Sequence, residues 1–434
     1  MVPMRERQSI GALMYAWAED IFPICRSLTG PGVRATLGYI QKQLSGLEII
    51  SVPSGYQAFD WTVPNEWTVR DAYVTNENGD RIIDFKMNNL HLVGYSEPTD
   101  QWLTLEELNN HLYSLPEQPD AIPYATSYYK RSWGFCLTHN NRMSLTPGQY
   151  RAVIDADLKP GILNYAELIV PGETDEEVLL STYICHPSMA NNEISGPVVT
   201  TALAQWLQSL EKRRYTYRIV FLPETIGSIV YLSRNLHKMK AKTIAGFVIT
   251  CVGDNRAYSL LPSRTGNTLA DRVAEHVLNN HTENYVRYSF LERGSDERQY
   301  CSPLIDLPVV SIMRTKYGKY TEYHTSKDDL SLINQEGLEG GFDCIRKCLQ
   351  ALEANWFYKA IIPCEPQLGK RGLYNISSND DIDLQGNVLA YADGKTDLIA
   401  MANIINSSVI DCFTVAENLV FNGLLSRGSG AFGD

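Results

Sequence analysis

Four short apolar runs, each ending abruptly in polar residues, dominate the middle of this chain. They span Val178–Ile184, Tyr215–Leu222, Ile244–Cys251 and Pro308–Met313. Runs of this length that do not alternate polar and apolar residues are typical of strands buried on both faces, as in parallel sheets covered by helices. A helical pattern over residues 198–212 follows the first run, with an apolar residue at every fourth position. The pattern therefore predicts an α/β fold with a largely parallel central sheet.

Side chains able to bind a metal or move a proton follow these runs. His186 comes directly after the first run, Glu224 after the second and Asp254 after the third, while His324 lies in the loop after the fourth. In open α/β sheets, ligands bind in the crevice beyond the carboxyl ends of the strands. Imidazoles and carboxylates without a cysteine cluster suit zinc. Each residue alone could be a helix cap or a solvated loop group, but the recurrence predicts a common site.

The flanking segments extend the same core. Helices are predicted at Ile10–Cys25 and Pro31–Leu44, and a strand at Leu47–Val52. Two further strands, Tyr150–Ala156 and Ile162–Val170, are expected to form a meander at the edge of the sheet.

Between the predicted strand at Leu47–Val52 and the one at Tyr150–Ala156 the composition of the chain changes. From about residue 60 to residue 140 it is rich in Trp, Tyr, Asn and Pro, with short strand-like pieces in place of helical periodicity. Asn78-Gly79 separates two such pieces, Asp71–Thr75 and Arg81–Lys86, and this dipeptide is a strong hairpin signal. A small β-rich domain inserted into the α/β core is therefore expected.

Three short helices are predicted near the C-terminus, at Asp383–Tyr391, Asp397–Ile405 and Ser408–Asn422. They resemble a winged-helix module, but the third helix has no lysine or arginine, which an element that contacts phosphates needs. The module is therefore interpreted as a protein-interaction or dimerisation unit. The expected domains are residues 1–59 with 141–361 for the α/β core, 60–140 for the insertion and 362–434 for the C-terminal module.

The amino-acid composition and net charge argue against some classes of binding partner. The chain has 434 residues, of which 44% are hydrophobic and 20% charged, and a net charge of −12. The acidic balance argues against nucleic acid or an anionic membrane as partner, and no apolar run reaches the length of about 18 residues expected of a membrane span. Nine cysteines without CxxC pairs, and an N-terminus without the apolar core of a signal peptide, predict free thiols in a cytoplasmic protein.

Five motifs carry a resemblance to a known family: CHPSMANNEISG, PETIGS, CVGD, GSDERQY and YHTSKDD, in this order. Over nearly its whole length the chain resembles the zinc-dependent aminopeptidases of the aminopeptidase Y and transferrin-receptor type. It is most similar to a bacterial aminopeptidase-like subfamily with an inserted β-rich domain and a winged-helix tail. The resemblance implies a doubly wound α/β/α sandwich, and a site with two zinc ions bridged by an aspartate and a water.

The resemblance also implies roles for individual residues. His186 resembles the first histidine ligand, and Asp254 the carboxylate on the same metal. His324 resembles the histidine on the other metal, and Glu224 the general base. Asp296 lies in a motif that shapes the substrate side of the pocket.

Two positions depart from the family pattern. Asn192 stands where the bridging aspartate is expected, and Thr225 where a second glutamate is expected. An amide brings no negative charge to hold two dications together, so one tightly bound zinc is predicted, with a weak or absent second site. Asn192, Glu193 or Glu322 could supply an additional ligand or hold a substrate amine. Glu322 could instead accept the ring N–H of a ligand histidine.

Asp296, Arg298 and Tyr323 are expected to line the substrate pocket. Arg298 could bind a substrate carboxylate, although an ion pair with Asp296 or Glu297 is the slightly favoured explanation. Tyr323 belongs to a tyrosine-rich loop in which packing alone accounts for at least two tyrosines.

The predicted function is zinc-dependent hydrolysis of amide bonds, as in an aminopeptidase-like exopeptidase acting on a peptide or small amide. Glu224 would take a proton from a zinc-activated water. One alternative is a single-zinc amidase or acyltransferase acting on a small or carbohydrate-linked amide. Another is a non-catalytic binding platform on a peptidase fold. Retention of the four candidate site residues favours an enzyme, whereas Asn192 and Thr225 favour the platform.

Overall fold

The computed structural model describes residues 9–128, 130–373 and 379–430. They form two compact units. The first comprises the chain up to Gly266 together with Val286–Phe342, and the second comprises Asn267–Tyr285 together with the chain from Asp343 onward.

An eight-stranded sheet forms the centre of the first unit, in the order β1-β10-β12-β11-β13-β16-β14-β15. Strands β11, β12, β13 and β16 are parallel to one another. The two strands that follow β11 in the chain, β12 and β13, lie on opposite sides of it, so the winding direction reverses at β11. The strands are β1 (Glu48–Pro53), β10 (Ile162–Val170), β11 (Glu177–Tyr183), β12 (Thr216–Leu222), β13 (Thr243–Val248), β14 (Ser259–Leu261), β15 (Val286–Arg287) and β16 (Val309–Met313).

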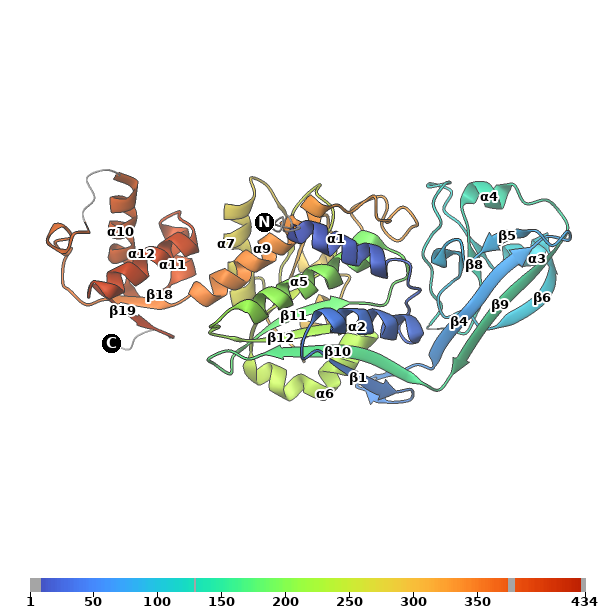
Figure 1. Ribbon diagram of the computed structural model, residues 1–434, viewed down its shortest axis with the longest axis horizontal. Coiled ribbons are helices and arrows are strands. Elements are labelled where there is room, and N and C mark those ends of the chain that lie inside the picture. The colour runs from blue at the N-terminus through green and yellow to red at the C-terminus, as the bar shows by residue number, and fades with distance from the viewer. Residues whose placement is uncertain (1–8, 129, 374–378, 431–434) are drawn as a thin grey trace, which may run out of the picture. The chain divides into compact units, whose positions relative to one another are not determined.

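Helices cover both faces of this sheet. Helices α1 (Ile10–Ile21), α2 (Pro31–Gln43) and α5 (Ser195–Ser209) lie together on one face, and α6 (Ile226–Lys242) lies on the other (Figure 1). All seven residues of β11 are buried, which is why its sequence does not alternate between polar and apolar residues. The predicted doubly wound α/β/α sandwich is confirmed.

The segment between β1 and β10 forms a second sheet, antiparallel and four-stranded, in the order β5-β4-β9-β6. The predicted hairpin is confirmed, because Thr75 pairs with Arg81 and Gly79 adopts a φ of +88° in the turn. The sheet's strands are β4 (Glu66–Thr75), β5 (Arg81–Asp84), β6 (Thr99–Thr104) and β9 (Gln149–Lys159). Shorter elements accompany it: β2 (Gln57–Ala58), β3 (Trp61–Thr62), η1 (Asn89–His91), α3 (Leu105–Asn109), β7 (Leu112–Tyr113), β8 (Phe135–Cys136) and α4 (His139–Met143).

The expected meander of β9 and β10 is wrong. β9 pairs with β4 and β6, whereas β10 pairs with β1 and β12 in the central sheet. The chain turns between the two sheets at Pro160-Gly161. A side chain at Gly161 would meet Glu66, because a Cβ there would lie 2.4 Å from the Glu66 Cβ.

The second unit contains the winged helix. A three-stranded antiparallel sheet, in the order β18-β17-β19, accompanies its three helices. These strands were not predicted, since β18 reads Asp-Gly-Lys-Thr-Asp and shows no apolar alternation. The unit's elements are α7 (Leu269–His281), the part of α9 (Gln335–Ala354) from Asp343, β17 (Phe357–Ala360), η4 (Gly369–Arg371), α10 (Asn379–Tyr391), β18 (Asp393–Asp397), α11 (Leu398–Ile404), α12 (Val409–Phe421) and β19 (Leu425–Gly428).

The cysteines and the apolar helices bear on two of the predictions made from composition. All nine cysteines are free thiols, as predicted. Of the described helices, none is by itself long and apolar enough to cross a membrane, and only the bent pair α11 and α12 meets these criteria when taken together.

A buried arginine ties three elements of the first unit together. Arg218 on β12 donates to Glu177 of β11 at 2.6 Å and to Glu167 of β10 at 2.6 Å. It also donates to the Tyr231 hydroxyl of α6 at 2.8 Å. Arg218 is 1% exposed and Glu177 is 2% exposed. Removing the arginine would therefore leave a buried carboxylate without its closest cationic partner.

We expect Arg218→Met to lower the free energy of unfolding by about 3–5 kcal/mol, the usual cost of breaking a buried ion pair from one side. Urea unfolding of the full chain measures the change. Arg70→Met is the matched control, because the side chains of Arg70 and its partner Asp155 are 48% and 51% exposed and such pairs contribute at most about 1 kcal/mol. Equal losses in the two variants would contradict the expectation.

Candidate functional site

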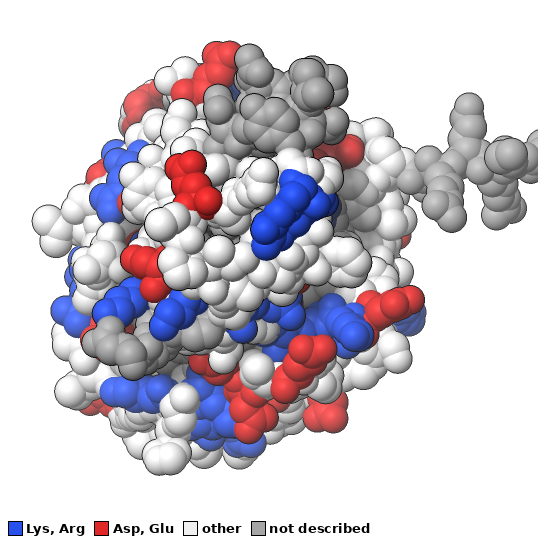
Figure 2. Space-filling model, turned by 90° about the vertical axis from the view of Figure 1, so that its left-hand side faces the viewer, with Lys and Arg blue, Asp and Glu red and all other residues white. Residues whose placement is uncertain are grey.

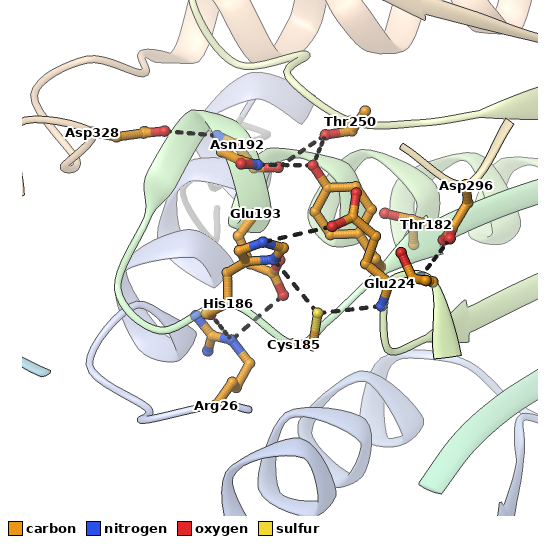
Figure 3. A network of polar contacts seen from close by, with 12 residues as sticks. Arg26, Thr182, Cys185, His186, Asn192, Glu193, Glu224, Thr250, Asp296 and Asp328 are labelled. Atoms are coloured by element: carbon orange, nitrogen blue, oxygen red, sulfur yellow. Dashed lines mark hydrogen bonds and ion pairs between the residues drawn. The ribbon is translucent and has the colours of Figure 1, made fainter. Parts of the chain in front are cut away.

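The carboxyl edge of the central sheet brings His186 and Glu224 together. His186 lies three residues beyond the end of β11, and Glu224 lies two residues beyond the end of β12. The imidazole Nε2 and the Glu224 Oε2 are 3.7 Å apart (Figure 3). That separation is longer than a hydrogen bond, so the Glu224 carboxylate is not held by His186.

The other side of the His186 ring is held by Glu193. His186 Nδ1 lies 2.8 Å from Glu193 Oε2, in a buried pair whose side chains are 6% and 1% exposed. Within the described chain, Cys185, His186 and Glu193 form one group of three whose potential ligand atoms all lie within 4.8 Å of one another. Because a carboxylate only accepts, Nδ1 carries a hydrogen, and Nε2 is the ring nitrogen that faces Glu224.

Arg26 completes this line of buried groups. Its Nε donates to the His186 carbonyl at 3.0 Å and lies 3.8 Å from Glu193 Oε1. A second guanidinium nitrogen donates to the Ile21 carbonyl at 2.7 Å. Arg26 follows α1 in the chain, far from the motifs, and no local signal in the sequence distinguishes it. The arginine offsets the cost of burying the Glu193 charge.

The electrostatics of the imidazole follow from these neighbours. Burial alone would lower the pKa of His186, but Cys185, Tyr124 and the hydrogen bond to Glu193 together raise it well above its usual value. Burial raises the pKa of Glu224, and the nearby His186 opposes that shift.

His324 is placed beside this pair by the loop after β16. Its ring stacks on Tyr323 with centroids 3.9 Å apart and lies 5.5 Å from the His186 ring. Burial and the His186 charge lower the pKa of His324 to about 3, so the ring is neutral. Its Nε2 is buried and makes no hydrogen bond to any described residue. A neutral imidazole with an open nitrogen is the form that binds a metal.

Both carboxylate oxygens of Asp254 accept hydrogen bonds from other residues of the protein. Its Oδ2 accepts hydrogen bonds from Asn191 Nδ2 at 2.9 Å and Thr315 N at 3.0 Å, and its Oδ1 accepts one from Thr315 Oγ1 at 2.7 Å. The structure therefore does not bring Asp254 into the His186 group, and its role as a ligand stays a prediction. The amide beside Asp254 is that of Asn191, whereas Asn192 donates instead to the Tyr183 hydroxyl at 2.8 Å.

The carboxylate of Asp296 contacts the start of α6, next to Glu224 in the chain. Its Oδ1 accepts hydrogen bonds from the Thr225 amide at 2.8 Å and from the Ser228 hydroxyl at 2.7 Å. Burial and the neighbouring Glu224 raise the pKa of Asp296 to about 8. Arg298 donates to Thr225 Oγ1 at 2.6 Å, and among the described residues it forms no ion pair with Asp296 or Glu297. These residues position the loop that carries Glu224.

Glu322 is paired with an arginine rather than with a histidine. It forms a two-pronged ion pair with Arg256, at 2.8 and 3.1 Å, and this arginine lowers the pKa of Glu322 to about 2. The contact predicted as one option for Glu322, accepting a histidine ring N–H, is made by Glu193 instead.

Several residues in strained backbone conformations lie at the carboxyl edge of the central sheet. Four non-glycine residues with positive φ follow four of the parallel strands: Ser188 at +39° after β11, Thr225 at +65° after β12, Cys251 at +51° after β13 and His324 at +56° after β16. Such conformations are costly, and they concentrate at functional sites where the surrounding structure enforces them. The strain supports a functional role for this edge of the sheet.

The comparisons with known proteins agree with this architecture. A family model described as a domain of unknown function (DUF4910) matches residues 15–355, and a winged helix-turn-helix model matches residues 356–427. A Clostridium acetobutylicum protein described as a polysaccharide biosynthesis protein with an aminopeptidase-like domain is 45% identical over 398 residues, covering 90% of this chain and 91% of that protein.

Solved structures show the same fold. The crystal structure of a Clostridium acetobutylicum protein, described as a peptidase on the basis of inference, matches with a TM-score of 0.91 and 43% identity, covering 96% of each chain. A zinc aminopeptidase from Bacillus subtilis matches with a TM-score of 0.59 and 11% identity, covering 81% of this chain and 96% of that one. At that identity the second likeness shows the fold alone, which is the zinc-aminopeptidase fold.

Asp328 holds the turn that carries Asn191 and Asn192. Its two carboxylate oxygens accept hydrogen bonds from the backbone amides of Asn191 at 2.6 Å and Asn192 at 3.0 Å. Both amides belong to the π-helical turn η2 (Ala190–Ile194), which leads into α5. Burial raises the pKa of Asp328 to about 6. The residue is part of a motif, but the sequence did not show that it faces η2.

We expect Asp328→Asn to loosen η2, because an amide group offers one acceptor oxygen where the carboxylate offers two. Hydrogen–deuterium exchange followed by mass spectrometry should show faster deuterium uptake in peptides that cover Ala190–Ile194. Asp329→Asn is the control, since the Asp329 carboxylate accepts local hydrogen bonds, from Ser331. Unchanged uptake in the Asp328 variant would show that this clamp does not hold the turn.

Proposed function

The chain belongs to the DUF4910 family, a domain of unknown function, and from this premise we propose that it is a zinc-dependent hydrolase of amide bonds. The observation that carries the proposal is the hydrogen bond between His186 Nδ1 and Glu193. Histidines that bind metals almost always donate their other ring N–H to a carboxylate, a backbone carbonyl or a water, and this contact sets the ring's orientation. The contact leaves His186 Nε2 open, 3.7 Å from the carboxylate of Glu224.

The residues present fit a zinc ion. His186 and His324 would hold it through their Nε2 atoms, and the His324 nitrogen is buried with no hydrogen-bond partner in the described chain. Asp254 is the predicted carboxylate ligand, and it would have to share its oxygens with Asn191 and Thr315. Imidazoles with a carboxylate are a common zinc ligand set. When bound, zinc polarises the scissile carbonyl and lowers the pKa of a bound water.

Glu224 is the residue that moves the proton. Its side chain is 20% exposed, and its backbone N–H is fixed by a hydrogen bond to the Cys185 sulfur at 3.2 Å. The raised pKa brings the carboxyl closer to the range in which a group both accepts and returns a proton near neutral pH. Glu224 would take a proton from the attacking water and pass it to the leaving amine.

One tightly bound ion is proposed rather than two. Asn191, the side chain that contacts Asp254, is an uncharged amide, and Asn192 and Thr225 add no charge. A second dication nearby would need a bridging carboxylate to offset the repulsion between the ions.

A second candidate substrate class, amides without a free α-amino group, is favoured because both glutamates expected to hold such a group are already paired. An aminopeptidase holds the free α-amino group of its substrate, and Glu193 and Glu322 were the residues expected to do this. Glu193 is already bonded to His186 and lies beside Arg26, and Glu322 is paired with Arg256. An amide without a free amine, such as one linked to a carbohydrate, fits this pairing. The Clostridium relative is described as a polysaccharide biosynthesis protein, which supports testing that class.

A panel of aminoacyl anilides and N-acylated amino sugars, incubated with the purified full chain, tests the activity. We expect Glu224→Gln to lower kcat by at least about a hundredfold, the usual scale for a general base, with zinc content unchanged. His186→Ala should lose both zinc and turnover, and Glu322→Gln should keep both. The zinc content of each variant is measured by inductively coupled plasma mass spectrometry. Full activity of Glu224→Gln, or zinc retained by His186→Ala, would refute the assignment.

The winged helix is proposed to contact protein rather than nucleic acid. Helices α10, α11 and α12 contain no lysine or arginine. Arg427 on β19 is paired with Glu417 at 2.7 Å and lies over the Trp356 ring. The face of the molecule in Figure 2 shows cationic residues interspersed with acidic ones, without a continuous basic patch. Phosphate recognition needs a concentration of cations.

We expect no binding to a random-sequence DNA duplex at micromolar protein concentration. Fluorescence anisotropy in low and moderate salt measures this, with a basic winged-helix protein as the positive control. Saturable binding that weakens steeply with added salt would mean that cations outside these helices form a phosphate-binding surface.

A further inference from the structure

The segment between β1 and β10 contributes a side chain to the site. The Tyr124 ring lies 5.2 Å from the His186 ring and 5.1 Å from the His324 ring, measured between centroids. It meets His324 edge-on, at an interplanar angle of 82°. Tyr124 therefore contacts both imidazoles that are candidates to hold the metal, although it is far from every motif in the sequence.

Tyr124 is held there by a short ladder between two loops. Its backbone N–H donates to the His324 carbonyl at 2.8 Å, and the Ser326 N–H donates to the Ile122 carbonyl at 2.8 Å. The Ile122 N–H donates to the Ser326 hydroxyl at 3.0 Å. Ile122 is buried in a small apolar cluster with Leu90, Val93 and Cys136. The position of the ring is thus determined by backbone pairing and by packing on both sides.

The Tyr124 hydroxyl is available to a ligand. It forms no hydrogen bond to any residue in the described parts of the chain, and the side chain is half-buried. The contrast with neighbouring tyrosines is direct. The Tyr183 hydroxyl bonds to Thr250 at 2.6 Å and to Asn192 at 2.8 Å, and the Tyr95 hydroxyl bonds to Thr29 at 2.6 Å. The fold uses the hydroxyls of these two tyrosines, whereas the Tyr124 hydroxyl beside the histidines is open to a ligand.

We propose that Tyr124 contacts the substrate, and that its hydroxyl donates a hydrogen bond to the oxygen of the amide carbonyl that is attacked. This inference rests on the proposed function, because it concerns the same site. Negative charge develops on that oxygen when water adds to the carbonyl carbon, and a fixed donor aimed at it stabilises the transition state more than the ground state. The inserted segment is then part of the site, which is incomplete without it.

Kinetics on whichever amide is turned over separate this role from packing. Tyr124→Phe keeps the ring and removes only the hydroxyl, so the melting temperature should stay unchanged while kcat falls about a hundredfold. KM should change little, because the hydrogen bond strengthens as charge develops. Tyr113→Phe is the matched control from the same segment, since Tyr113 is 45% exposed. An unchanged kcat in Tyr124→Phe would overturn the proposal.

A binding measurement keeps the test independent of turnover. Acetohydroxamic acid carries a carbonyl oxygen and a metal-binding group, and calorimetry on zinc-loaded Glu224→Gln protein measures its affinity. Adding Tyr124→Phe should weaken binding about tenfold. If that loss appears but no amide is hydrolysed, the proposed hydrolysis fails and the Tyr124 contact stands. Equal affinity would overturn the contact, and no binding at all would overturn both.

Discussion

The orientation of a single imidazole governs the candidate site, and a buried carboxylate determines it. Glu193 accepts from His186 Nδ1 at 2.8 Å, while Arg26 lies against the opposite oxygen of the same carboxylate at 3.8 Å. A carboxylate that is 1% exposed is stable in the interior only when paired and hydrogen-bonded. The arginine, the glutamate and the histidine therefore form one unit, in which each residue depends on the next for its position.

The loops around this unit place amide and hydroxyl side chains next to the site, and their carboxylates accept hydrogen bonds from the protein. Asn191 links Gly253 and Asp254 to η2 through both ends of its side-chain amide. Asp328 holds the backbone of the same turn, and Asp296 holds the start of the helix behind Glu224. Carboxylates that could have faced a second metal are thus absent or are used as backbone acceptors. This polarity is the basis for proposing one bound ion rather than two, and the strained backbone after four strands lies at the same edge.

The inserted segment is joined to that edge by hydrogen bonds. Gln118 donates to the Thr321 carbonyl at 2.8 Å, next to the pairing between Ile122–Tyr124 and the loop that carries His324. The loop after β16 therefore has two neighbours, the sheet on one side and the insertion on the other. The positive φ of His324 is stabilised from the side of the insertion, because the Tyr124 N–H donates to the His324 carbonyl.

Local patterns in the sequence were enough to predict the parallel strands, the hairpin at Asn78-Gly79 and the placement of His186 and Glu224 at strand ends. Each of these depends on residues close together in the chain, through burial, turn chemistry or topology. The pairing of β9 and β10 with different sheets, and the strands of the winged helix, depended on distant partners and could not be read from their own residues. The same holds within the site, where Glu193 rather than Glu322 faces His186 and Asn191 rather than Asn192 faces Asp254. Arg26 and Tyr124 reach the site from distant parts of the chain. Their roles exist only because tertiary packing brings these segments together, and no periodicity or motif encodes such a contact.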